Sequence, residues 1–188
     1  METAMRTLIV TEFMTLDGVV DSPGGGEHPR AGWTFNEVPF VEEMYDLKGR
    51  EQDEAGAMML GRVSYDEFAP VWPTMDEFDV YNAMPKYVVS STLTDPEWNN
   101  TTVLRSLDEV AALKQGDGEG TIIVHASLTL AQGLAEAGLV DRYHLLVFPV
   151  VLGEGKRLFN GREQGSLKLV EHEVYSNGVV KQVFDVMR

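Results

Sequence analysis

The sequence predicts an α/β domain in which a mostly parallel sheet is flanked by helices and ends in an antiparallel pair of strands. Strand-like apolar runs alternate with helix-like segments up to about residue 150. Asn177-Gly178 then joins two alternating segments, residues 167–175 and 179–187, and this dipeptide is the strongest short-range hairpin signal. With 188 residues and 44% hydrophobic content, the chain is expected to form one domain over residues 1–188.

The first part of the chain should contribute a strand, a loop and a helix. Residues 7–14 form an apolar run of strand length, and Asp17-Gly18 closes it with a turn. Residues 21–32 contain two prolines and three successive glycines, which predicts a mobile loop. Pro39 suits a first helical position, so we expect a helix from there to about Ala55.

Capping signals mark the later helices. In Ser106-Leu107-Asp108-Glu109, the serine and glutamate side chains should satisfy free backbone N–H groups, as in a capping box. Ser127 is expected to be the N-cap of a further helix, which Gly138 terminates. The remaining expected elements are a helix beginning at Arg62 and strands at residues 57–60, 86–90, 101–104, 121–125 and 142–152.

The charge of the chain argues against several classes of partner. Its 15 Lys and Arg residues and 30 Asp and Glu residues give a formal net charge of -15, which would repel a nucleic-acid backbone. No apolar run approaches the roughly 20 residues of a membrane span, and the first residues do not have the pattern of an export signal. We therefore expect a cytoplasmic protein with neither a nucleic-acid nor a membrane partner.

The residue types exclude several kinds of catalytic site. The sequence has no cysteine, which rules out thiolate zinc sites and cysteine nucleophiles. The four histidines contain no His-x-x-x-His pair, and there is no Gly-x-Ser-x-Gly elbow, phosphate loop or Gly-x-Gly-x-x-Gly fingerprint. We therefore expect no metal site and no α/β-hydrolase nucleophile.

Two expected strand-to-helix junctions have residues that suit phosphate binding. Leu60-Gly61-Arg62-Val63-Ser64 places a glycine, a guanidinium and a hydroxyl at a helix start, and His125-Ala126-Ser127-Leu128 forms a second such junction. A helix start offers free N–H groups and positive dipole character to a phosphate. Each junction alone is more often an ordinary helix cap. Together with Ser90-Ser91-Thr92, however, they would line one cleft in an open α/β sheet and could hold a diphosphate cofactor.

Five motifs occur along the chain in an order typical of one family. They are Thr15-Leu16-Asp17-Gly18, Leu60-Gly61-Arg62-Val63-Ser64-Tyr65, Pro85-Lys86-Tyr87-Val88-Val89-Ser90, Val124-His125-Ala126-Ser127 and Pro149-Val150-Val151-Leu152-Gly153-Glu154-Gly155-Lys156. This set resembles the dihydrofolate reductase-like proteins, and most closely a stand-alone reductase domain of the riboflavin-pathway deaminase-reductase. The resemblance implies an eight-stranded dihydrofolate reductase-like fold, NADPH as cofactor, hydride transfer to a pterin-like or pyrimidine-like ring, and a homodimer.

The resemblance also implies which residues contact the cofactor. The family usually has glycine at the position of Ala126, where the backbone approaches the diphosphate. It often has arginine at the position of Ser91, where a guanidinium can bind the 2′-phosphate that distinguishes NADPH from NADH. The family's cofactor contacts carry over onto Gly18, Gly61, Arg62, Val63, Ser64, Ser90, Ser91, Ala126, Ser127 and Leu128.

Three acids are candidates for the substrate end of the site. Asp17 matches the family's turn near the nicotinamide and substrate. Glu43 and Asp46 lie on the first expected helix, where dihydrofolate reductases anchor the pterin with one acid, although the interpretation as ordinary exposed acids is favoured for both. Trp33 and Phe35 could stack on a planar ring or anchor the core, and both interpretations stay open.

Other charged residues have weaker claims. Lys156 and Arg157 could bind a substrate phosphate, or they could be a solvated pair on a hairpin. His125 is expected to be a core histidine. Because Ala126 and Ser91 depart from the family pattern, the alternative function is a non-catalytic ligand-binding or assembly protein that retains the reductase fold.

Overall fold

The computed structural model describes residues 5–162 and 165–188, which contain eight strands and six α-helices. The strands are β1 (Leu8–Thr15), β2 (Ala55–Gly61), β3 (Lys86–Val89), β4 (Thr101–Leu104), β5 (Thr121–His125), β6 (Arg142–Phe148), β7 (Ser166–Val174) and β8 (Val180–Met187). The helices are α1 (Trp33–Asn36), α2 (Asp46–Glu54), α3 (Arg62–Phe68), α4 (Asp79–Ala83), α5 (Leu107–Gln115) and α6 (Leu128–Glu136). The short 3-10 segments are η1 (Glu42–Tyr45), η2 (Trp72–Thr74) and η3 (Asp76–Phe78).

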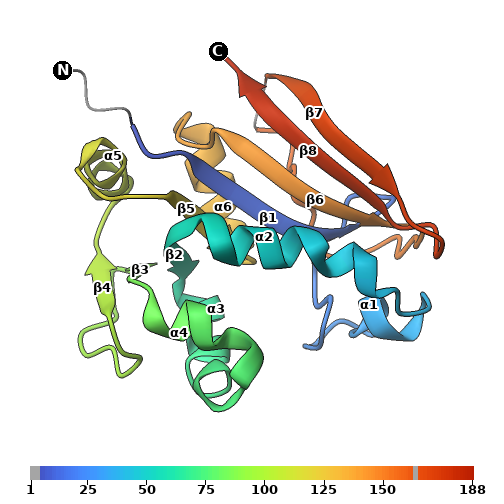
Figure 1. Ribbon diagram of the computed structural model, residues 1–188, viewed down its shortest axis with the longest axis horizontal. Helices are drawn as coiled ribbons and strands as arrows, with labels where there is room; N and C mark the ends of the chain where they lie inside the picture. Colours follow the sequence, from blue (N-terminus) through green and yellow to red (C-terminus); the bar gives the residue numbers. More distant parts are fainter. Residues whose placement is uncertain (1–4, 163–164) are drawn as a thin grey trace.

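The eight strands form one sheet in the order β4-β3-β2-β5-β1-β6-β8-β7 (Figure 1). The six neighbouring strands β4, β3, β2, β5, β1 and β6 pair in parallel. Strand β8 is antiparallel to both β6 and β7. The expected mostly parallel sheet with a C-terminal antiparallel hairpin is therefore confirmed. From β1 the chain runs outward to β4 and then returns to place β5 and β6 on either side of β1. Ligands bind beside such a reversal of strand order in open α/β sheets.

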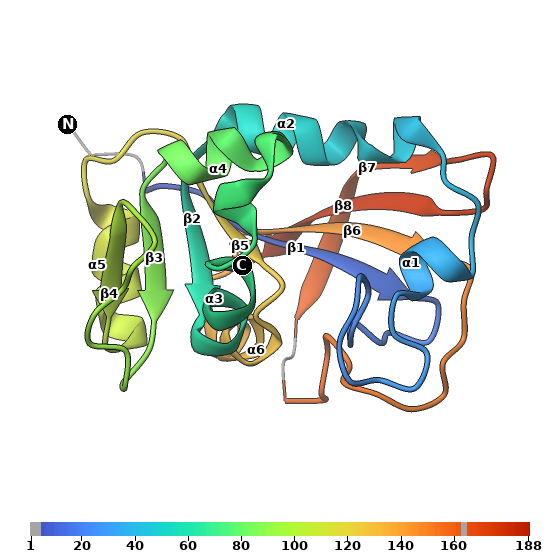
Figure 2. The same cartoon turned by 90° about the horizontal axis from the view of Figure 1, so that it is seen from below.

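Helices cover both faces of the parallel part of the sheet (Figure 2). On one face, α5 and α6 pack against a buried cluster that includes Val10 and Val124. On the other face, α3 and α4 pack against a cluster that includes Ile9 and Leu60. Because successive residues of a strand point to opposite faces, Glu12 of β1 lies on the α6 face.

Two expected elements differ from the observed ones. The helix expected from Pro39 begins as the 3-10 segment η1 and becomes α-helical only at Asp46, and Val41 before it is extended. The strand expected at residues 142–152 ends at Phe148, because the following Pro149 has no N–H for the ladder. Ser106 does cap α5, since its Oγ accepts a hydrogen bond from the Glu109 N–H.

The glycine-rich segment at residues 21–32 is held by specific hydrogen bonds. Trp33 Nε1 donates to the Asp21 carbonyl at 2.8 Å, and Thr34 Oγ1 donates to the Pro23 carbonyl at 2.7 Å. Trp33 is fully buried in a cluster that also contains Phe148. This segment therefore folds back onto α1 and forms a wall at the C-terminal end of β1.

Candidate functional site

The β2–α3 and β5–α6 junctions lie side by side where their strands end (Figure 2). Their contact is reciprocal. The Gly61 N–H donates to Ser127 Oγ at 2.9 Å, and the Ser127 N–H donates to Ser64 Oγ at 3.0 Å. Ser64 and Ser127 are both buried by this contact. The structure therefore brings together the two helix starts that the sequence singles out.

Both helix starts are left without a side-chain cap. Ser127 is the N-cap residue of α6, as the sequence predicts, but its side chain makes no capping hydrogen bond. Ser127 has a φ of 59°, in the left-handed region, whereas a capping residue is extended, and its hydroxyl is bound to Gly61. The N–H groups in the first turn of a helix have no intrahelical partner. Two uncapped helix starts in contact form a site with the chemistry to bind an anion.

Ala126 stands in the turn between β5 and α6 with a φ of 47°. A residue with a Cβ in this left-handed conformation costs roughly 1–2 kcal/mol, which explains why glycine suits this position. The backbone keeps the conformation in spite of the alanine methyl. Strain of this kind is found at ligand sites, where the backbone has to follow a particular path.

The end of β3 lies next to the start of α3. Ser90 is buried, and its Oγ accepts hydrogen bonds from the N–H groups of Thr92 and Leu93. Arg62 Nη1 donates to Thr92 Oγ1 at 3.3 Å, while Arg62 Nε lies 2.8 Å from both carboxylate oxygens of Asp66. The guanidinium of Arg62 is thus beside the β3 end, but a carboxylate already compensates its charge.

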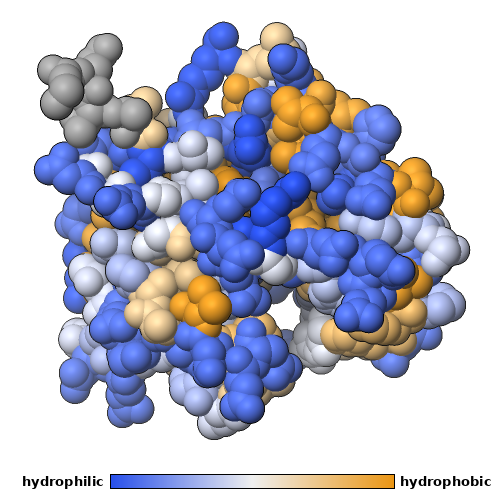
Figure 3. Space-filling view, viewed as in Figure 1, coloured by the Kyte–Doolittle hydropathy of each residue, from blue (hydrophilic) through white to orange (hydrophobic). Residues whose placement is uncertain are grey.

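An opening passes below α2, between the side formed by α3 and α4 and the segment that precedes α1 (Figure 3).

Asp17 lies at the turn after β1 and connects this turn to a second loop. Its carboxylate accepts hydrogen bonds from Thr15 Oγ1 and from the N–H groups of Leu152 and Gly153. Burial opposes ionisation of Asp17, but these hydrogen bonds outweigh it and lower its pKa. Asp17 therefore positions the turn with a carboxylate that is already engaged.

A buried polar layer under α2 is the feature that sequence reasoning missed. Thr11 of β1 and His144 of β6 are paired across the sheet, and both reach Glu51 of α2. Glu51 Oε1 accepts from Thr11 Oγ1 at 2.7 Å and lies 2.9 Å from His144 Nδ1. Lys48 Nζ lies 3.3 Å from Glu51 Oε2 and also donates to Thr11 Oγ1. The available signal was a pair of polar residues, Thr11-Glu12, inside an otherwise apolar strand.

The charge state of this layer follows from its contacts. Burial alone would raise the pKa of Glu51, but the charge of Lys48 and the hydrogen bond with His144 outweigh it and lower the pKa to about 2. His125 closes the layer on the β5 side, with its ring edge-on to Tyr81 at 4.8 Å between centroids. Burial lowers the pKa of His125 to about 4, so it is a neutral histidine at pH 7.

Glu12 is a buried carboxyl on the other face of β1. It is 4% exposed, and its Oε1 has no hydrogen-bond partner among the described residues. Burial raises its pKa to about 8, although the charge of Lys48 acts in the opposite direction. Glu12 is therefore mostly protonated at pH 7.

The other candidate residues lie at the margins. Glu43 and Asp46 are exposed, because the inward side of this segment is formed by Met44 and Leu47. Phe35 is 62% exposed, so only Trp33 of the aromatic pair anchors the core.

Arg157 and Lys156 belong to the loop opposite the turn after β1. Arg157 Nε donates to the Asp17 carbonyl at 3.1 Å, and Arg157 Nη2 donates to the Gly153 carbonyl at 3.0 Å. Arg157 thus holds two loops together, while Lys156 is exposed.

Among residues 5–162 and 165–188, no group of three or more His, Asp or Glu side chains is placed to hold a metal ion. In the same part of the chain, no helix has the length and apolar character needed to cross a bilayer.

Comparison with known proteins shows the family of the chain. Residues 6–181 match the RibD C-terminal domain family. The uncharacterized protein YyaP of Bacillus subtilis (strain 168) is 28% identical over 192 residues, with 95% of this chain and 94% of YyaP covered.

Solved structures show the same fold. The crystal structure of a protein from Shewanella sp. PV-4, named as a riboflavin biosynthesis protein, superposes with a TM-score of 0.75. The two chains are 19% identical, and the superposition covers 97% of this chain and 99% of that one. Dihydrofolate reductase from Enterococcus faecalis, complexed with NADP(H) and RAB-propyl, gives a TM-score of 0.64 at 14% identity, covering 97% of each chain. The dihydrofolate reductase-like fold expected from the motifs is therefore confirmed.

Proposed function

Because the chain belongs to the RibD C-terminal domain family, we propose that it is a cytoplasmic reductase that transfers hydride from NADPH to a small pterin-like or pyrimidine-like ring. The observation that carries the proposal is the pair of uncapped helix starts, at α3 and α6, held together by Ser64 and Ser127. A dinucleotide diphosphate is an anion of the kind that such starts bind. The similarity to a dihydrofolate reductase complexed with NADP(H) supports the same assignment.

The proposal gives each segment of the site a role. The backbone of residues 61–64 and 126–128 binds the diphosphate, and Ser90-Ser91 borders the adenosine end. Asp17-Gly18 holds the turn near the nicotinamide, through the contacts of Asp17 with Leu152 and Gly153. NADPH supplies the hydride when bound, so the chain has to orient the two rings and exclude water. Exposed Glu43 and Asp46 receive no role in this proposal.

A charge placed in the β5–α6 turn tests the proposal. We expect Ala126→Asp to raise the Kd for NADPH roughly 100-fold, because a carboxylate beside the diphosphate adds several kcal/mol of repulsion. Ala126→Asn is the matched control, since asparagine has the same shape and also tolerates a positive φ. Isothermal titration of both variants and the unchanged protein measures the difference.

The outcomes of this titration separate the two functions considered. If the unchanged protein binds neither NADPH nor NADH at millimolar concentration, the non-catalytic alternative is favoured. If Ala126→Asp and Ala126→Asn raise the Kd for NADPH by the same factor, the added negative charge has no effect of its own. The diphosphate then does not lie beside Ala126. Ala126→Gly should bind NADPH at least as tightly as the unchanged protein, because it removes the methyl and the strain.

We further propose that the protein is a homodimer that pairs through β7. This strand is at the edge of the sheet and carries exposed apolar side chains, and apolar surface lies over it in Figure 3. Leu169→Lys should shift the sedimentation coefficient from dimer to monomer, whereas Val71→Lys on a distant surface should not. A monomeric unchanged protein at micromolar concentration would contradict this proposal. The exposed apolar residues at this edge are Leu167, Leu169, Val170 and Val174 of β7 and Met187 of β8.

A further inference from the structure

The last residues of β1 have an open side beneath α2. In the sheet register, Thr11 of β1 lies between His125 of β5 and His144 of β6. Strand β5 ends at His125, whereas β1 continues to Thr15. Side chains on one face of a strand are two residues apart, so Phe13 follows Thr11 on the face that α2 covers. Among the described strands, none lies beside this part of β1 on the β5 side, and Figure 3 shows an opening below α2.

The inward acid of α2 has no carboxylate oxygen left for a ligand in this opening. The Glu51 side chain is fully buried, its Oε1 is shared by two side chains of the sheet, and its Oε2 lies 3.3 Å from Lys48 Nζ. Glu43 and Asp46 lie on the exposed side of the segment. A ring bound beneath α2 is therefore not recognised by an acid of this helix.

Lys48 is the charged residue of α2 that lies over the open part of β1. Its Nζ is 4.9 Å from the centre of the Phe13 ring, and its side chain is 16% exposed. Nζ donates to Thr11 Oγ1 and to Glu51 Oε2. An ammonium group has three N–H donors, so one remains after these two contacts. Among the described residues, no third acceptor lies within hydrogen-bond distance of Nζ.

We propose that Lys48 determines the choice of substrate, by donating this third N–H to an exocyclic oxo oxygen of a ring bound beneath α2. The inference rests on the proposed function, because a ring that receives hydride has to reach this end of β1. Thr11 and Glu51 fix the position of Nζ and are positioning residues. The charged group that α2 offers to a substrate is thus a cation, and the preferred ring presents an acceptor to it.

An oxo group and an amino group differ strongly as partners of this ammonium group. An oxo oxygen accepts the N–H, and a hydrogen bond from a charged donor is stronger than one between neutral groups. An amino group presents its own N–H groups, so the Lys48 donor would be left without an acceptor in a partly buried site. A site built around a polar contact strongly rejects a ligand that cannot make it.

Pterin and 2,4-diaminopteridine are matched probes, because one has an oxo group where the other has an amino group. The full chain is saturated with NADP+, which cannot donate hydride, and each probe is titrated by its own fluorescence. We expect the unchanged protein to bind pterin about tenfold or more tighter than 2,4-diaminopteridine. In Lys48→Met the two Kd values should agree within about threefold. Lys48→Arg should retain part of the preference, because it keeps the charge.

Two further variants separate recognition from folding and from net charge. Lys48→Met leaves the buried Glu51 carboxylate without its lysine partner, whereas Lys48→Met combined with Glu51→Leu removes both charges together. The double variant should also lack the preference for pterin. Lys168→Met removes the same charge from an exposed site on β7 and should leave the preference intact. The Kd for NADP+, measured for every variant, reports whether the variant is folded.

Each outcome bears on one proposal. If the unchanged protein binds neither NADPH nor NADP+, the proposed function is overturned, and the role of Lys48 with it. If the cofactor-loaded protein binds 2,4-diaminopteridine as tightly as pterin, or binds neither ring at millimolar concentration, the role of Lys48 alone is overturned. The same holds if the preference for pterin persists in Lys48→Met and in the double variant while both still bind NADP+.

Discussion

Glu12→Gln should make the protein markedly more stable above pH 8 than the unchanged chain. The Glu12 carboxyl has its pKa raised by burial from 4.5 to about 8. A group whose folded pKa is raised stabilises the fold below its unfolded pKa, and that stability is lost as the pH rises through the folded pKa. Between pH 4.5 and 8 the unfolded chain releases this proton while the folded chain retains it. The loss amounts to about 5 kcal/mol once both states are ionised.

Urea unfolding at pH 5, 7 and 9 measures this effect. The difference in unfolding free energy between Glu12→Gln and the unchanged protein should grow in favour of the variant as the pH rises, because glutamine cannot ionise. Taking this difference removes the contributions of all other titrating groups. Glu43→Gln is the control, since Glu43 is exposed. A difference that stays constant from pH 5 to 9 would show that Glu12 is not held neutral by the fold.

The fold was largely predictable from the sequence because its signals are local. The apolar run of β1, the Ser106 cap and the Asn177-Gly178 turn each act within a few residues, and the structure has a strand, a cap and a hairpin there. The 3-10 start of α2 was not predictable, because Met44 is placed by packing against distant residues such as Phe148. Local patterns do not report packing of that kind.

The candidate site was predictable in position but not in detail. Gly61 and Ser127 were identified as helix starts, but the bond between them crosses 66 residues of sequence. This bond decides that Ser127 leaves α6 uncapped. The partners of Glu51 come from β1 and β6, so its role follows only from the register of the sheet. Two departures from the family, Ala126 and Ser91, also needed the structure to show what surrounds them.

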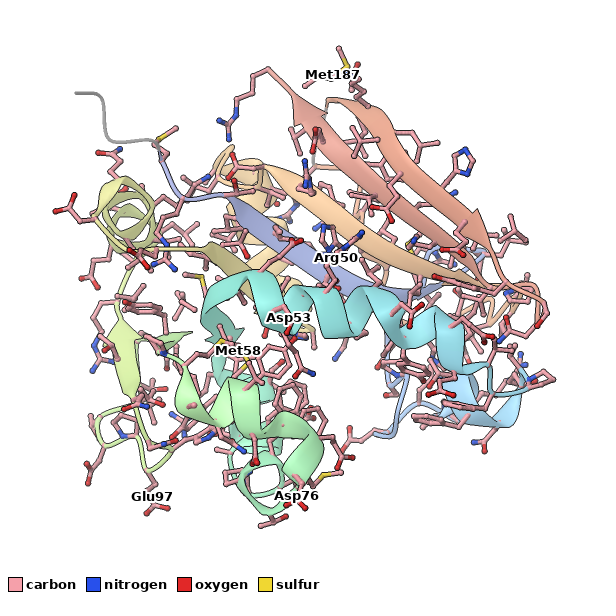
Figure 4. The ribbon with its side chains drawn as sticks, viewed as in Figure 1. Arg50, Asp53, Met58, Asp76, Glu97 and Met187 are labelled. Atoms are coloured by element: carbon pink, nitrogen blue, oxygen red, sulfur yellow. The ribbon has the colours of Figure 1, made fainter. Side chains whose placement is uncertain are left out.

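Removal of the Glu51 charge should destabilise the protein by roughly 3–5 kcal/mol at pH 7, as expected when one partner of a buried ion pair is lost. In Glu51→Gln, the Lys48 ammonium would lose its only carboxylate partner among the described residues, and His144 would lose a charged acceptor. A typical domain has a stability of about 5–15 kcal/mol, so this is a large fraction of the total. Urea unfolding should show it as a lower midpoint. Asp53→Asn, on the exposed side of the same helix (Figure 4), should change the midpoint little.

The acid dependence of the same pair distinguishes an ionic role from a packing role. The pKa of Glu51 is lowered from 4.5 to about 2, so its stabilising effect is complete above pH 4.5 and is lost as the pH falls through 2. The unchanged protein should lose about 3 kcal/mol over this range through Glu51, whereas Glu51→Gln should lose none of that part. If the two proteins lose stability in parallel, the carboxylate contributes by its shape. If instead the role is ionic, the double variant Lys48→Met with Glu51→Leu should recover stability that Glu51→Gln lacks, because an apolar pair leaves no buried charge without a partner.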